Sequence, residues 1–143
     1  MTEVSFYTNV PERLSYLCRL LRKAQQSGAR VAVVGPSALL DRLDAALWSF
    51  EPTEFVPHLR WRGAPTQQAL VAATPIVLAE QALEQPHREV LLNIGSGMPA
   101  DFEQFRRVLE VVSREPEQVQ AGRERFKHYK ARGFKVTHHE VPA

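Results

Sequence analysis

The residues best suited to chemistry lie together near the C-terminus, in the segment 123–135 (RERFKHYKARGFK). This segment contains six cations and three aromatic rings but a single carboxylate, Glu124. If the segment is helical, a turn of 100° per residue places Arg123, Lys127 and Lys130 on one stripe, with Phe126 on its flank. A row of cations beside an exposed ring suits an acidic ligand that also has an apolar group.

Two plainer interpretations of this segment exist. Charged helix faces are commonly just solvated, and Phe126, Tyr129 and Phe134 could equally anchor the helix in the core. The charge distribution favours a binding surface, because cations alternate with acids elsewhere, as in Asp41-Arg42, but stand almost unopposed here. A helix C-terminus accounts for one or two cations, not for six. We therefore predict a local basic binding surface.

A second group of side chains suited to binding lies between Leu43 and Arg62. Large rings are concentrated here around two prolines, so that not all of them can reach a central core. One hypothesis is that these rings are exposed and form a partner-binding site. The other is that they pack beneath the long connection as a small apolar cluster separate from the main core. A third hypothesis is that Arg60-Trp61-Arg62 stacks on single-stranded bases, although few other cations lie nearby. The rings and their apolar neighbours are Trp48, Phe50, Phe55, Val56, Pro57 and Trp61.

Residues for catalysis, metal binding or nucleotide binding follow no recognisable pattern. None of the five histidines lies in a zinc-binding frame, and His138 and His139 on a strand would point to opposite faces. The turn at Gly35-Pro36 and the loop 93–99 follow apolar runs, as phosphate-binding turns do, but neither matches a phosphate-binding motif. We expect no catalytic, cofactor-binding or metal-binding residues. The alternative is a small nucleotide-dependent α/β enzyme that uses Gly35 or the 95–97 turn.

Length and composition describe an ordinary globular protein. A chain of 143 residues, 44% apolar and 24% charged, is expected to form one domain over 1–143 without disulfides or metal. A net charge of +2 is too small for a general polyanion binder. The single cysteine, Cys18, lies in an apolar helical pattern, and we expect it to be a small buried apolar residue. No signal peptide or membrane-spanning run is visible, which predicts a cytoplasmic protein.

Strands alternate with helices along the chain. Apolar runs such as Val31–Val34 are typical of buried parallel strands. Segments with helical spacing of apolar residues lie between these runs, and glycine or proline marks their boundaries. Alternation of this kind predicts a single-domain α/β fold with an open, mostly parallel sheet, Rossmann-like but lacking a nucleotide-binding motif. We expect strands over 4–8, 30–34, 75–79, 89–94 and 135–141, the last at an edge, and helices over 11–26, 37–50, from 99 or 101 to 112, and from 116 through the basic segment.

Five ordered blocks of the sequence resemble the chi subunit of bacterial DNA polymerase III, a clamp-loader accessory protein. The likeness runs from Phe6-Tyr7 almost to the end of the chain, and the order of the blocks makes it far more specific than any one block. The blocks are Leu43-Asp-Ala-Ala-Leu-Trp48, Phe55-Val-Pro-His58, Val90-Leu-Leu-Asn93, Phe102-x-x-Phe105-x-Arg107-Val-Leu-Glu-Val-Val112 and Arg123-x-Arg-Phe-Lys-x-Tyr-Lys-x-x-Gly-Phe134.

This resemblance implies a function in DNA replication without an active site. The chain would be an accessory subunit of a DNA-directed DNA polymerase, a nucleotidyltransferase holoenzyme. It would bridge the psi subunit to the acidic, phenylalanine-terminated tail of single-stranded DNA-binding protein, and would contact DNA only indirectly. Family members also bind a helicase-like repair protein through a similar region. The expected location is the cytoplasmic, nucleoid-associated replisome.

The resemblance also implies site residues. The tail would bind Arg123, Phe126 and Lys127, with Lys130 and Gly133 at the margin. The psi subunit would bind Trp48, Phe55, Val56 and Pro57. This chain has Val119 where some members have a lysine, and Phe126 where they have a tyrosine, so we expect a weaker or rearranged tail site. The segment Arg60-Trp61-Arg62 is not part of the family pattern.

Overall fold

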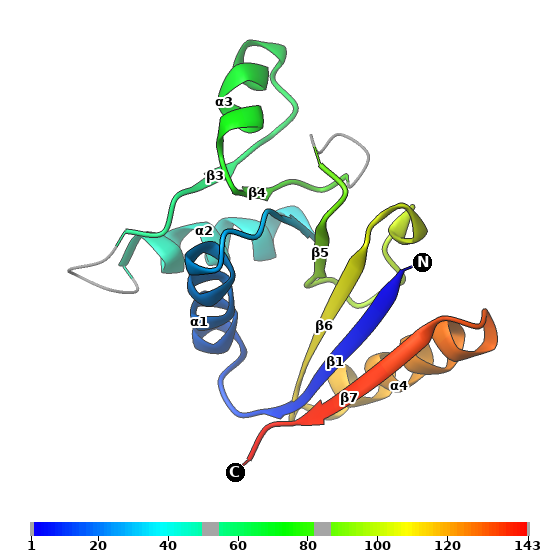
Figure 1. Ribbon diagram of the computed structural model, residues 1–143. Coiled ribbons are helices and arrows are strands. Elements are labelled where there is room, and N and C mark those ends of the chain that lie inside the picture. The colour runs from blue at the N-terminus through cyan, green and yellow to red at the C-terminus, as the bar shows by residue number, and fades with distance from the viewer. Residues whose placement is uncertain (1, 50–54, 82–86, 143) are drawn as a thin grey trace.

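The computed structural model describes residues 2–49, 55–81 and 87–142 and shows a seven-stranded sheet in which every pairing is parallel. The strand order is β3-β4-β2-β5-β6-β1-β7 (Figure 1). The strands are β1 (Glu3–Val10), β2 (Val31–Val34), β3 (His58–Arg60), β4 (Ile76–Leu78), β5 (Val90–Asn93), β6 (Arg107–Ser113) and β7 (Lys135–Glu140). The helices are α1 (Arg13–Gln26), α2 (Ser37–Ser49), α3 (Gln68–Ala73) and α4 (Pro116–Ala131), with short 3-10 turns η1 (Pro65–Gln67) and η2 (Phe102–Gln104).

Helices cover both faces of the sheet. Alternate residues of β2 point to opposite faces, so that Val31 and Val33 pack against α1 and α2, while Ala32 and Val34 join the core beneath α4. On this second face, α3 closes a smaller cluster around Trp61. Burial on both faces explains why the sequence of β2 is continuously apolar. The prediction of an open α/β sheet flanked by helices is confirmed.

The expected helix from 99 or 101 to 112 is wrong. A single turn of 3-10 helix, η2, leads into β6, a central strand between β5 and β1. The spacing of Phe102, Phe105, Val108, Leu109 and Val112 fits a helix face, but every residue of β6 after Arg107 is buried. Because a central parallel strand buries both faces, its apolar residues need not alternate and can imitate helical spacing.

Two short elements were not predicted, β3 and α3. No strand was expected over 58–60 and no helix over 68–73, and three or six residues are too few to show a clear period. The edge strand at the C-terminus is confirmed as β7, which pairs only with β1 among the described strands. Phe50, predicted as part of the ring cluster, lies outside the described residues.

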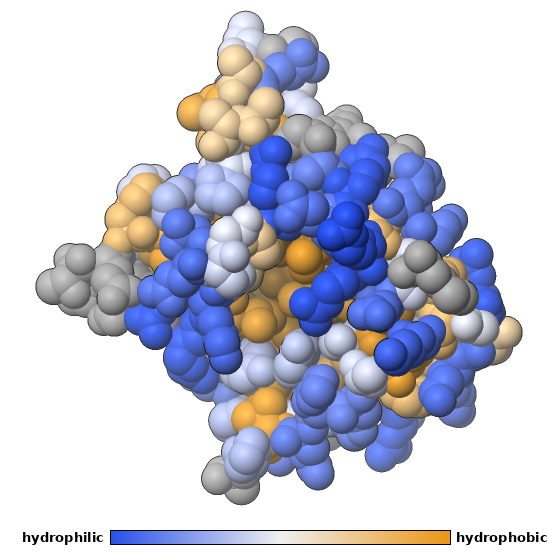
Figure 2. Space-filling view, viewed as in Figure 1, coloured by the Kyte–Doolittle hydropathy of each residue, from blue (hydrophilic) through white to orange (hydrophobic). Residues whose placement is uncertain are grey.

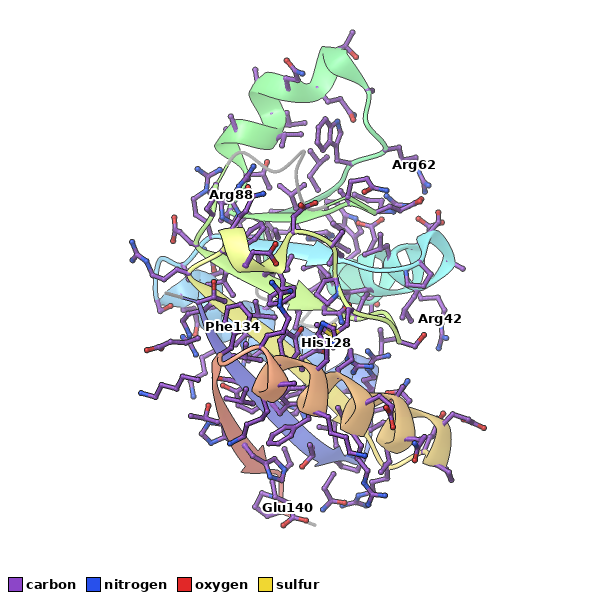
Figure 3. The ribbon with its side chains drawn as sticks, turned by 90° about the vertical axis from the view of Figure 1, so that its right-hand side faces the viewer. Arg42, Arg62, Arg88, His128, Phe134 and Glu140 are labelled. Atoms are coloured by element: carbon purple, nitrogen blue, oxygen red, sulfur yellow. The ribbon has the colours of Figure 1, made fainter. Side chains whose placement is uncertain are left out.

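The unit β6–α4–β7 places the basic segment on the sheet. In Figure 3, α4 crosses the face of the strands, and Glu140 marks the carboxyl end of β7 below it. Pro116 stands at the first helical position, where its missing N–H costs no hydrogen bond. At the other end, Gly133 has a φ of 83°, and the Phe134 N–H donates to the Tyr129 carbonyl at 3.2 Å. This left-handed residue ends the helix and turns the chain into β7.

Candidate protein-docking site

The inward face of α4 is fixed by a buried polar cluster rather than by apolar contacts alone. Arg125 Nε donates to Glu110 Oε1 at 3.0 Å, and the Tyr129 hydroxyl donates to Glu110 Oε2 at 2.7 Å. Asn93 Nδ2 donates to the same carboxylate, and Arg125 also donates to the Ser96 carbonyl. Burial raises the pKa of Glu110, although the Arg125 charge opposes this shift. Two residues of the basic segment therefore belong to the core.

Two of the six cations in the segment 123–135 are opposed by acids, contrary to the expectation from the sequence. Arg125 is buried against Glu110, and Arg132 lies 3.8 Å from Glu103. The Arg132 guanidinium also lies over the Phe102 and Phe134 rings, at 5.3 and 5.5 Å from their centroids. Sequence spacing alone does not show these partners, because both acids precede α4 and reach it only through the fold.

The outward stripe of α4 agrees with the predicted helix geometry. Arg123, Lys127 and Lys130 are exposed, and none of them forms an ion pair within the described residues. Lys130 Nζ lies 5.9 Å from the centroid of the Phe126 ring. Phe126 itself is half-buried, with its ring edge-on to Phe6 at 5.3 Å. This stripe of exposed cations thus borders a ring that is partly accessible.

A pocket of about 440 Å³ lies between α4 and the carboxyl ends of β1, β6 and β7. Of the five residues predicted to bind the tail, Arg123 and Phe126 line it, whereas Lys127, Lys130 and Gly133 do not. Its walls are largely apolar, and charged and polar groups stand among them. The lining residues are Phe6, Thr8, Asn9, Val112, Ser113, Arg114, Val119, Gly122, Arg123, Phe126, His138 and Glu140.

Sequence reasoning missed most of this lining. The part of the lining that α4 supplies can be predicted from helical spacing, which places its four residues on one face. These are Val119, Gly122, Arg123 and Phe126. The contributions of β1, the end of β6 and β7 depend on strand order, for which the sequence contains no local signal. Val119, noted as a departure from the family, forms part of the apolar wall.

Gly122 allows α4 to lie close to the sheet at this pocket. A Cβ added at this position would meet Val112 Cγ2 at 2.9 Å. Carbon atoms at that distance repel, so a larger residue would force the helix or the valine to move. The glycine therefore helps to set the width of the pocket, at the cost of about 1 kcal/mol of helix propensity relative to alanine.

The second predicted surface brings two of its four residues together in solvent. Trp48 and Phe55 are 62% and 59% exposed, and their ring centroids lie 5.2 Å apart. The His58 ring packs edge-on against Trp48, and its Nε2 lies 3.1 Å from Asp44 Oδ1. Pro57 is half-buried and Val56 is buried in the core, so Val56 can act only as a support. Figure 2 shows apolar atoms at this left-hand edge, over the end of α2.

The segment Arg60-Trp61-Arg62 is not a stacking platform for bases. The Trp61 ring is buried, and its Nε1 donates to the Ala64 carbonyl at 3.2 Å. Arg60 and Arg62 both donate to Asp41, at 2.9 and 2.6 Å, and the Arg60 hydrogen bond contributes most to lowering the pKa of that carboxyl. These contacts attach β3 to α2 and account for the segment structurally.

The two glycine turns considered for nucleotides lie against each other at the ends of β2 and β5. A Cβ added at Gly35 would meet Ile94 Cγ1 at 2.7 Å. The Gly95 N–H, which a phosphate cradle would need, donates to Asn93 Oδ1 at 3.0 Å. A pocket of about 280 Å³ beside these turns is lined by two acids, Glu115 and Glu117, and by two arginines. Both arginines, Arg13 and Arg125, already donate to backbone carbonyls. This geometry does not favour the nucleotide-dependent enzyme.

Residues 2–49, 55–81 and 87–142 contain no group of three or more His, Cys, Asp or Glu side chains placed to hold a metal ion. None of their helices combines the length and the apolar character needed to cross a bilayer.

Comparison with known proteins agrees with the resemblance seen in the sequence. The family model of the DNA polymerase III chi subunit, HolC, matches residues 1–137. The chain belongs to this family. The chi subunit of Pseudomonas aeruginosa is 32% identical to it over 99% of each chain. Those of Escherichia coli and Haemophilus influenzae are 30% and 28% identical, over 84% and 87% of this chain and 80% and 84% of their own.

Family membership confirms the expected identity and implies an accessory role in DNA replication as a subunit of the DNA polymerase III holoenzyme. The pocket at α4 and the Trp48–Phe55 surface are the candidate docking sites of this chain.

Proposed function

We propose that this chi-family chain is a non-catalytic adaptor that joins the psi subunit to the acidic tail of single-stranded DNA-binding protein. The pocket at α4 receives the phenylalanine-terminated tail, and the Trp48–Phe55 surface receives psi. The observation that supports the tail site most strongly is an apolar pocket lined by an exposed arginine, Arg123, that forms no ion pair with the described residues. An acidic peptide that ends in an aromatic residue is complementary to both features.

The energies required are ordinary for a peptide site. A micromolar dissociation constant corresponds to about −8 kcal/mol. Two or three well-placed side chains supply most of such an energy, so loss of one of them costs on the order of 2 kcal/mol. Because Arg123, Lys127 and Lys130 are exposed, their attraction to the tail is screened and falls as the salt concentration rises.

Calorimetric titration with a synthetic tail peptide tests this proposal. We expect micromolar binding to the native protein, and about 30-fold weaker binding to Phe126→Ala and Arg123→Ala. Lys127→Ala should weaken binding only about threefold, because Lys127 lies outside the pocket lining. Arg42→Ala is the matched control, since Arg42 is an exposed arginine on α2 and lies well apart from Glu140 in Figure 3. Binding that Arg123→Ala and Phe126→Ala leave unchanged would contradict the proposed site.

The psi surface is tested by co-expression and affinity purification with the psi subunit. Trp48→Ala and Phe55→Ala should each reduce recovery of the complex, because both are large apolar side chains that lie exposed and in contact with each other. Leu70→Ala is the control, since Leu70 is an equally exposed apolar residue on α3, at 53%. Equal losses for Leu70→Ala and Trp48→Ala would show that psi docks elsewhere.

A further inference from the structure

A second arginine lines the pocket at α4, and it comes from the sheet rather than from the helix. Arg114 is exposed and follows β6 directly. Its Nε donates to Asn9 Oδ1 at 3.0 Å and to the Asn9 carbonyl at 3.3 Å. The two terminal nitrogens of its guanidinium make no hydrogen bond or ion pair within the described residues. One edge of the group is therefore fixed, while the other is left for a ligand.

Asn9 has an unusual backbone conformation that serves this contact. Its φ is 61°, in the left-handed region that asparagine tolerates better than most residues. The pairing of β1 with β6 shifts at this point, between Tyr7 and Val10, and Asn9 Nδ2 donates to the Val141 carbonyl at 3.0 Å. Asn9 thus connects the ends of β1 and β7 to Arg114, and its side chain is held from two sides.

The shape of a C-terminal phenylalanine determines which cations can reach its carboxylate. Ring and carboxylate are attached to the same Cα, so a ring inside the pocket leaves the carboxylate at the pocket itself. The arginines that line the pocket are Arg114 and Arg123, whereas Lys127 and Lys130 lie outside the lining. Guanidinium groups bind carboxylates with two parallel hydrogen bonds, which a lysine cannot do.

We propose that Arg114, oriented by Asn9, joins Arg123 in binding the terminal carboxylate of the peptide in this pocket. Lys127 and Lys130 then face the acidic residues that precede the terminal phenylalanine. Arg114 is a specificity-determining residue for a free C-terminus, and Asn9 is its positioning residue. This inference rests on the proposed function of the pocket as the tail site.

Two peptides that differ only at the C-terminus test the inference. One is the tail peptide with a free carboxylate, and the other is the same peptide with a terminal amide. Each is titrated into the native protein and into Arg114→Gln, Asn9→Gly and Arg42→Gln. Glycine accepts the positive φ of Asn9, so Asn9→Gly removes the side chain without imposing backbone strain. Arg42→Gln removes the same charge from an exposed site on α2.

We expect Arg114→Gln to weaken binding of the free-acid peptide about tenfold and to leave binding of the amide almost unchanged. Asn9→Gly should reduce the preference for the free acid about threefold, an effect that a purely structural role would not produce. If Arg114→Gln weakens both peptides equally, or neither more than Arg42→Gln does, the inference is wrong while the tail site stands. If neither peptide binds the native protein, both the inference and the tail site are wrong.

Discussion

Arg125 and Glu110 form a buried ion pair between α4 and β6, with Nε and Oε1 3.0 Å apart. Arg123, two positions earlier on α4, points to solvent and lines the pocket. A helix turns 200° in two residues, so the same sequence motif supplies one arginine to the core and one to the surface. The buried pair thereby sets the rotation of α4 about its axis.

Removal of one partner of this pair should be far more harmful than removal of both. Arg125→Met leaves the Glu110 carboxylate buried without its charge partner, and we expect a loss of about 3 kcal/mol in the free energy of unfolding. In the double variant Arg125→Met with Glu110→Gln, much of this loss should be recovered. Urea denaturation of both singles and the double variant measures the coupling. Strictly additive losses would show that the pair does not act as a unit.

Gly122→Ala tests the close approach of α4 to β6. Alanine should stabilise a helix by about 1 kcal/mol relative to glycine. Here the added Cβ meets Val112 at 2.9 Å, so we expect no gain in thermal stability and weaker binding of the tail peptide. In a Val112→Ala background the same substitution should be better tolerated, because the clashing methyl groups are gone. A stabilising Gly122→Ala with unchanged binding would contradict this account of the pocket.

Both proposed partners should bind at the same time. The α2 helix, which presents Trp48, and α4 pack on opposite faces of the sheet, and the pocket lies toward the β7 edge while His58 lies in β3 at the other. We expect tail-peptide affinity to be the same within about twofold with and without bound psi. Fluorescence anisotropy of a labelled peptide titrated with the protein alone and with the psi complex makes this comparison. Competition between the two ligands would refute the separation of the surfaces.

His87 should make stability depend on pH in mildly acidic solution. Burial, with a smaller contribution from Arg30, lowers the pKa of His87 to about 4, against about 6.5 in an unfolded chain. Below pH 6.5 the unfolded state takes up a proton that the native state binds only near pH 4. The free energy of unfolding should therefore fall as the pH drops across this window, on the order of 2 kcal/mol for this residue.

The difference between the native protein and His87→Asn isolates this contribution from those of other groups, such as Glu110. Asparagine can accept the Glu89 N–H in place of His87 Nδ1, which lies 3.2 Å away. We expect the stability of His87→Asn, measured by urea denaturation from pH 7 to pH 4.5, to fall less steeply. Parallel curves for the two proteins would show that His87 is protonated equally in both states.

The periodicity of apolar residues and the positions of glycine and proline were sufficient to predict most of the fold. Apolar runs located β2, β4 and β5, and helical spacing located α1, α2 and α4. The strand β6 was predicted as a helix, because burial on both faces gives its apolar residues a spacing that also fits a helix. The elements β3 and α3 were missed because they are too short for a period to appear.

The sequence by itself determined which side of α4 would be charged and that Trp48 and Phe55 would be candidates for a surface, because helical geometry and composition are local properties. Only the tertiary structure decided that Arg125 is buried with Glu110, that Val56 is in the core and that Arg114 lines the pocket. Asn9 and Arg114 are 105 positions apart in the chain, yet their side chains form a hydrogen bond. Contacts of this kind depend on strand order, which no local pattern of residues specifies.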